Sequence, residues 1–345
     1  MLNQTSNSKA WLVANVLALL VAGPVMAQND RVFPIGGSPV SGPITNVTKQ
    51  GITIKVGGTD QNIPANRISK IMFSGDPPEL TRGREFVMDA QYDKAIEEFK
   101  KVDVSKIKRD VIIADLAFYR FYSEAQLGLT GQGNRGQAAA NLINFVRQHG
   151  ESWHHFAAAR TLGDLAMSEG KFEGAKNFYK QLEKSTATEN RIASVYLIGA
   201  VDLQMGNLDE ALNAFDKVIG ARVNSPEEAR LQNLAKAGRV AVLGSKGDTE
   251  AAISESNALI EALNPSDTEL AARIYNARGR AMTKAGQHDA AIRAYLHTHL
   301  MFSNTPDAHV ESLTALVQLW PQVGKPDRAG QMRQVLQQSY PGWGG

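Results

Sequence analysis

The chain contains no cysteine among its 345 residues. This absence excludes a disulfide framework, a thiolate metal site and a cysteine nucleophile. The chain also has almost no excess of charge of either sign, because its 37 Lys and Arg side chains are balanced by 35 Asp and Glu side chains. Proteins dedicated to nucleic-acid binding normally carry a strong basic excess. We therefore expect no nucleic-acid partner.

Sequence motifs of catalysis are missing as well. The chain has no G-x-S-x-G nucleophile elbow and no G-x4-G-K-[ST] phosphate loop. Residues 131–136 match the G-x-G-x-x-G fingerprint, but the residues before them have helical periodicity and not the strand that nucleotide binding needs. No two of the seven histidines have the H-x3-H spacing that would place them on one helical face. We predict no enzymatic activity, no cofactor and no metal.

A single long apolar run stands at the N-terminus, from residue 10 to residue 22. Lys9 precedes it as the only charge before Asp30, and small residues occupy positions −3 and −1 of a cut before Gln28. The run is shorter than the about 20 residues that a membrane-spanning helix needs. We predict that residues 1–27 are a cleaved signal peptide. The mature product is then periplasmic or secreted and has no transmembrane segment.

The second predicted unit covers residues 28–76 and is rich in strands. Apolar residues alternate with polar ones at 52–56, and Gly57-Gly58 fits the turn of a two-residue hairpin. In pattern the unit resembles a small SH3-like or Sm-like barrel. Its only aromatic residues after position 30 are Phe33 and Phe73, too few for a stacking platform. We expect it to cap the helical region or to mediate self-association, and the alternative is a module that holds cell-wall glycan or peptide.

Residues 77–345 repeat a pattern of small and aromatic residues. In four segments a glycine is followed twelve residues later by an alanine, and an aromatic residue comes four residues after that. The triplets are Gly83/Ala95/Phe99, Gly163/Ala175/Tyr179, Gly199/Ala211/Phe215 and Gly279/Ala291/Tyr295. The pattern resembles the tetratricopeptide repeat, and weaker units surround Ala139, Ala252 and Ala329. The resemblance implies a mainly α fold, in which a solenoid of six to seven helix pairs follows a small all-β barrel-like module.

The same resemblance implies a concave groove that is lined by the first helix of each pair. Carrying the groove positions over, repeat by repeat, indicates seven side chains: Arg160, Tyr196, Arg239, Arg273, Asn276, Arg280 and Lys284. The C-terminal half of this set is basic. Some proteins of this family hold a terminal carboxylate of a peptide with such side chains. We predict an exported scaffold that binds an acidic peptide or a protein of the cell envelope, and the alternative is a solvated surface without a ligand.

Overall fold

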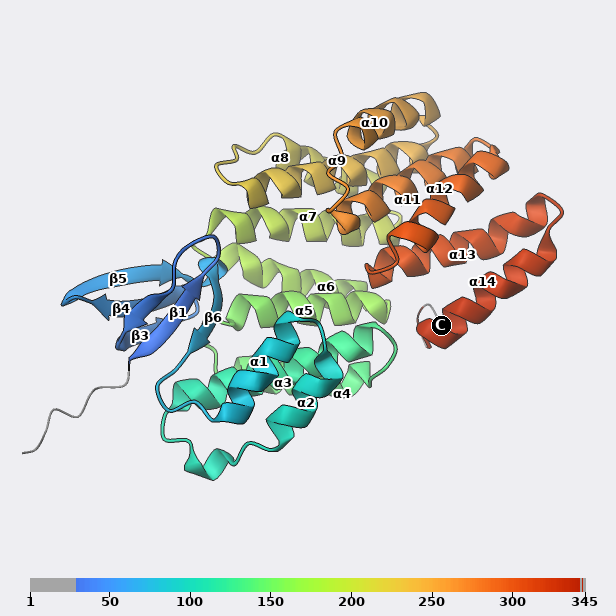
Figure 1. The fold of residues 1–345 in the computed structure, drawn as a ribbon. Coiled ribbons are helices and arrows are strands. Elements are labelled where there is room, and N and C mark those ends of the chain that lie inside the picture. Colours follow the sequence, from blue (N-terminus) through green and yellow to red (C-terminus); the bar gives the residue numbers. More distant parts are fainter. Residues whose placement is uncertain (1–28, 342, 344–345) are drawn as a thin grey trace, which may run out of the picture.

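The computed structural model describes residues 29–341 and Trp343, and the predicted signal peptide lies outside this range. Within the described residues a small β module comes first and fourteen α-helices follow (Figure 1). None of the described helices combines the length and the apolar character that crossing a membrane requires.

The β module consists of two three-stranded antiparallel sheets, with strand orders β2-β1-β6 and β3-β4-β5. Its strands are β1 (Asp30–Pro34), β2 (Val40–Gly42), β3 (Ile44–Thr48), β4 (Gly51–Val56), β5 (Thr59–Pro64) and β6 (Ile68–Met72). Gly57 and Gly58 have φ of 57° and 88°, so the β4–β5 hairpin turns as its glycine pair predicts. Only Pro43 separates β2 from β3, so the chain passes from one sheet to the other at this corner. The likeness to an SH3-like or Sm-like barrel stays a prediction.

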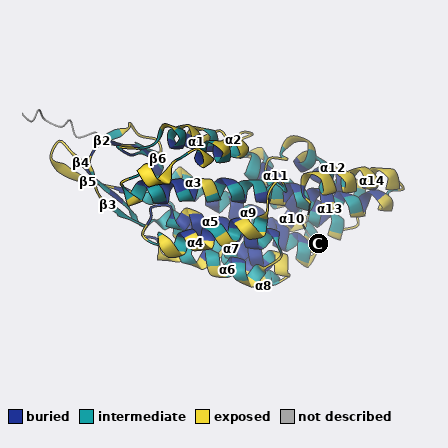
Figure 2. Ribbon diagram, turned by 90° about the horizontal axis from the view of Figure 1, so that it is seen from below, coloured by how far each residue is buried: buried dark blue, intermediate teal, exposed yellow. Residues whose placement is uncertain are grey.

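The helices form seven consecutive pairs within the described residues, which confirms the expected solenoid of six to seven pairs. They are α1 (Pro78–Met88), α2 (Tyr92–Lys100), α3 (Asp110–Leu129), α4 (Arg135–Gln148), α5 (His155–Ser168), α6 (Phe172–Tyr179), α7 (Thr188–Met205), α8 (Leu208–Ile219), α9 (Pro226–Lys246), α10 (Thr249–Glu261), α11 (Thr268–Lys284), α12 (His288–Met301), α13 (Pro306–Gln322) and α14 (Pro326–Ser339). Buried residues run along first helices such as α5, α7 and α9, whereas second helices such as α4 and α8 show more exposed positions (Figure 2).

The repeated glycines and aromatics meet where the two helices of a pair cross. A Cβ placed on Gly163 would lie 2.2 Å from the ring of Tyr179, so the ring occupies the space that a larger side chain would need. Ala175 and Ala211 are fully buried at the equivalent crossings. The small residues therefore set how closely the helices approach, as the repeat pattern predicts.

The predicted register of the second pair is wrong by one residue. Ala138 and Leu142 are buried in the core, while Ile143, which belonged to the predicted core frame around Ala139, is 46% exposed. Residues 138–140 are all alanine, so the apolar pattern fits either frame. Tertiary packing decides between them, because Ala138, Leu142 and Phe145 lie on the helix face that is buried against the core.

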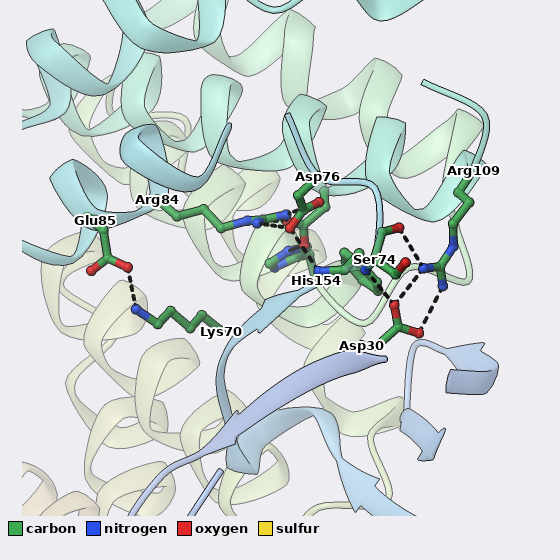
Figure 3. Close-up of polar contacts among 10 residues, drawn as sticks. Asp30, Lys70, Ser74, Asp76, Arg84, Glu85, Arg109 and His154 are labelled. Atoms are coloured by element: carbon green, nitrogen blue, oxygen red, sulfur yellow. Dashed lines mark hydrogen bonds and ion pairs between the residues drawn. The ribbon is translucent and has the colours of Figure 1, made fainter. Parts of the chain in front are cut away.

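A buried charge network joins helices α1 and α3 and the start of α5 to Asp76, which lies in the segment between β6 and α1 (Figure 3). The guanidinium of Arg84 is 1% exposed and donates to Asp115 at 2.7 Å and to Asp76 at 2.5 Å. Pro77 holds the N-cap position of α1, and the carboxylate of the preceding Asp76 accepts from Arg84. His154 lies 2.8 Å from the other oxygen of Asp115. Burial lowers the pKa of His154, so the ring is neutral and donates to this carboxylate.

Further contacts tie the β module to later repeats. Arg109 at the start of α3 donates to Asp30 at 2.5 and 3.0 Å. The turn and helical segments of the module then reach three more sites along the solenoid. These ion pairs and hydrogen bonds join Lys49 to Glu151, Asn66 to Glu189, and Arg67 to Glu227. The module is therefore packed along the edge of the solenoid and shares one apolar core with its first helices.

Candidate functional site

The inner side of the solenoid holds an open cavity of about 870 Å³. Its walls come from the first helices α5, α7, α11 and α13, together with the end of α3 and Trp343. This volume lies in the range of protein sites that hold small ligands or short peptide segments. The cavity occupies the side of the solenoid on which the resemblance places a groove.

Five of the seven predicted groove residues line this cavity: Arg160, Tyr196, Arg273, Arg280 and Lys284. Asn276 is instead buried between α11 and α13, where its amide donates to the carbonyl of Ala308 at 2.8 Å. Arg239 forms ion pairs with Asp216 of α8 and Glu255 of α10. Both partners belong to second helices, so Arg239 lies on the outer layer. Whether any of the seven binds a ligand stays a prediction.

The cavity is not basic in its C-terminal half, which corrects the charge expected from the sequence. Four basic side chains line it, Arg160, Arg273, Arg280 and Lys284, and four acidic ones oppose them, Asp164, Glu269, Asp307 and Glu311. Arg273 contacts Glu269 at 3.1 Å and Asp307 at 3.0 Å. Arg280 contacts Glu311 at 2.5 Å. The two α11 arginines that line the cavity, Arg273 and Arg280, are therefore neutralised by carboxylates of the protein itself.

Two of these acidic residues escaped the sequence reasoning because they lie on α13. That helix has no glycine in the repeat frame, so no groove position could be carried over to it. The i, i+4 spacing of Glu269 and Arg273 was a readable signal of an ion pair on one helix. The contacts from α11 to Asp307 and Glu311 had no comparable signal, since they join residues more than thirty positions apart.

Arg160 and Lys284 differ from the other two basic residues of the cavity. Neither side chain has an ion pair or hydrogen bond with any residue in the described part of the chain. The Arg160 side chain is exposed to the cavity. Tyr196 is only 4% exposed, and its hydroxyl, at the cavity wall, likewise has no hydrogen bond to a described residue. These three groups leave unused donors that face the cavity.

Burial changes the acidity of the groups around Arg160. It raises the pKa of Tyr196 to about 12, so this hydroxyl keeps its proton. Burial also raises the pKa of Asp164, which accepts a hydrogen bond from Tyr179 at 2.8 Å. Glu269 behaves oppositely: burial would raise its pKa, but Arg273 and Arg230 lower it to about 2. At neutral pH the α11 wall thus carries paired charges, and Tyr196 remains a donor.

The fold and the cavity define an α-solenoid of the tetratricopeptide type. No protein-family model matches the sequence, and no curated protein matches it either. Among solved structures, a tetratricopeptide repeat protein from Parabacteroides merdae ATCC 43184 is similar, with a TM-score of 0.53 and 16% identity over 76% of this chain and 92% of that one. A Rap protein complexed with Competence and Sporulation Factor has a TM-score of 0.54 and 13% identity over 77% and 76%. These likenesses show the shared fold.

Proposed function

We propose that this chain is a non-catalytic scaffold that binds a peptide or a segment of a protein in the solenoid cavity. The observation that carries the proposal is a cavity on the inner side of the solenoid whose wall includes Arg160, Tyr196 and Lys284. The donors of these three side chains have no hydrogen bond or ion pair to any residue that the structure describes. The Rap protein of the same fold was crystallised with Competence and Sporulation Factor, which supports a binding role for a solenoid of this kind. The partner proposed here is a peptide or protein of the cell envelope.

The unpaired donors indicate which chemical group the cavity binds. A carboxylate of the peptide can accept from the guanidinium of Arg160 and from the Tyr196 hydroxyl, and such charge-assisted hydrogen bonds are stronger than neutral ones. Arg273 and Arg280 are already paired with Glu269, Asp307 and Glu311. A peptide with one or few carboxylates fits this cavity, whereas a polyanion would meet the acidic side chains of α13.

Replacing Arg160 by glutamate is expected to weaken partner binding at least tenfold, or by about 1.4 kcal/mol. The change removes an unpaired cation and places a like charge near the ligand carboxylate. The measurement is the affinity of the mature chain for a partner captured from envelope extract, titrated by calorimetry. Arg239→Glu is the matched control, because Arg239 lies outside the cavity, and it should leave the affinity unchanged. Equal affinities for both variants and the parent would contradict this assignment.

We further propose that the chain is exported and acts outside the cytoplasm. Expressed in its native host, the mature protein is expected to begin at Gln28, because small residues precede that position and the apolar run is short for a membrane span. Mass spectrometry of the intact mature protein checks this. A membrane-bound form that retains residues 11–21 would show that the N-terminal segment is an anchor.

The contacts of the β module favour the capping role over an independent glycan-binding role. Its apolar core continues into that of the first helices. Its polar side chains reach the solenoid at Glu151, Glu189 and Glu227. We propose that the module caps the helical region along its edge, where it covers the core of the first helices and reaches as far as the start of α9.

A further inference from the structure

The C-terminal end of the chain makes contacts that a linear solenoid does not require. In a stacked repeat each unit touches only its neighbours. Here the guanidinium of Arg135 at the start of α4 donates to the carbonyl of Pro341 at 3.1 Å. The indole of Trp343 donates to the carbonyl of Leu129 at the end of α3, also at 3.1 Å. The last pair therefore touches the second pair, and Figure 1 shows the end of α14 beside the α3–α4 region.

The α3–α4 loop packs closely against the residues that follow α14. Gly131, in the loop between α3 and α4, has φ of +75°, and a Cβ there would lie 2.5 Å from Cδ of Pro341 and 2.9 Å from the carbonyl oxygen of Ser339. Only glycine accommodates both this backbone conformation and this approach. The α3–α4 loop, which carries the G-x-G-x-x-G pattern, thus packs directly against Ser339, Tyr340 and Pro341.

The same C-terminal residues are fixed to the last helix pair. The hydroxyl of Tyr340 lies 2.8 Å from Nδ1 of His309 on α13, and Tyr340 is 7% exposed. The guanidinium of Arg135 lies 5.8 Å from the centre of the Trp343 ring, which is within the range of a cation–π contact. Tyr340, Pro341 and Trp343 therefore bridge α13 and the α3–α4 loop.

This bridge is part of the cavity wall. Leu129 and Trp343 line the cavity together with residues of α5, α11 and α13. The bridge spans the gap between the second and the last helix pair on this side of the cavity. Among the described residues, two hydrogen bonds and one cation–π contact are the polar contacts that join it to the α3–α4 region. A terminal segment held by so few polar contacts can open locally at a small fraction of the global unfolding free energy.

We propose that Tyr340, Pro341 and Trp343 form a latch that closes the solenoid around its cavity and regulates access to it. This proposal depends on the proposed function in one respect only, namely that the molecule entering the cavity is a peptide or a protein segment. With the latch closed, the cavity admits a free end or a short ligand. With the latch released, the gap between α3 and α13 admits a longer segment from the side.

The absence of cysteine permits a direct test of access. Ala200 of α7 lines the cavity and is half-buried, so Ala200→Cys introduces the only thiol of the mature chain. The rate of modification is measured with two reagents, N-ethylmaleimide and a maleimide attached to a polymer bulkier than the cavity. The ratio of the two rates reports how far access to this thiol is restricted by size.

Adding Trp343→Ala is expected to raise the rate with the bulky reagent at least fivefold and to leave the rate with N-ethylmaleimide nearly unchanged. Gly131→Ala should act in the same direction, because its methyl group displaces Pro341. Gly136→Ala is the matched control, since a Cβ there would meet only Asn134 within 4 Å. Circular dichroism confirms that each variant keeps its helices.

An unchanged rate with the bulky reagent in folded Trp343→Ala overturns the latch. If that variant does not fold, Gly131→Ala decides by the same criterion. An increase in Gly136→Ala equal to that in the latch variants also overturns it, because general loosening would then explain the result. The experiment contains no peptide, so its failure leaves the proposed binding function standing, and a silent Arg160→Glu leaves the latch standing.

Discussion

Replacing Arg84 by methionine is expected to lower the free energy of unfolding by about 3–5 kcal/mol. The guanidinium is 1% exposed and neutralises the carboxylates of Asp76 and Asp115, whose side chains are 6% and 1% exposed. Methionine has a similar length but leaves two buried carboxylates close together without their cation. The unfolding midpoint in urea, followed by circular dichroism at neutral pH, measures the loss. It is a large part of the 5–15 kcal/mol that stabilises most domains.

Arg82 on the same helix provides the matched control for this prediction. Its side chain is 53% exposed and pairs with Glu79 and Glu98 at the surface. Exposed ion pairs contribute roughly 0–1 kcal/mol, so Arg82→Met should change the midpoint little. A loss of the same size in both variants, or none in Arg84→Met, would show that the buried network does not contribute the expected stability.

Phe215→Ala is the second substitution with a large expected effect, again about 3–5 kcal/mol of unfolding free energy. The ring is 1% exposed and lies at the crossing of three helices. A Cβ on Gly199 of α7 would be 3.1 Å from it, and one on Gly238 of α9 would be 2.5 Å from it. Truncation leaves a cavity that these backbones cannot easily fill. Urea unfolding of the mature chain measures the effect.

Leu300→Ala is the matched control for Phe215→Ala, because it truncates an apolar side chain at the exposed end of α12. Leu300 is 70% exposed, so its loss should change stability by less than about 0.5 kcal/mol. If Phe215→Ala were as mild as Leu300→Ala, the ring would not occupy the crossing and the repeat frame would be out of register. The outcome therefore tests the frame on which the groove positions depend.

Local spacing was sufficient to predict the repeat architecture. A glycine, an alanine and an aromatic residue at fixed separations place small residues on the crossing face of two helices, and that relation stays within one repeat. The same reasoning placed five of the seven groove residues on the inner side: Arg160, Tyr196, Arg273, Arg280 and Lys284. It misplaced Asn276 and Arg239, because the orientation of a first-helix side chain also depends on how the neighbouring helices pack against it. The hairpin at Gly57-Gly58 was also predicted, because glycine adopts a positive φ without steric cost wherever it stands in the chain.

The sequence by itself determined the helix pairs, the β module and the side of the solenoid that carries the cavity, because each follows from residues close together in the chain. Tertiary structure alone decided the charge of that cavity, where α13 places Asp307 and Glu311 against the arginines of α11. It also decided that the C-terminus reaches Leu129, more than two hundred residues away. Spacing along the chain encodes helix faces, whereas contacts between distant repeats depend on the accumulated rotation of every pair between them.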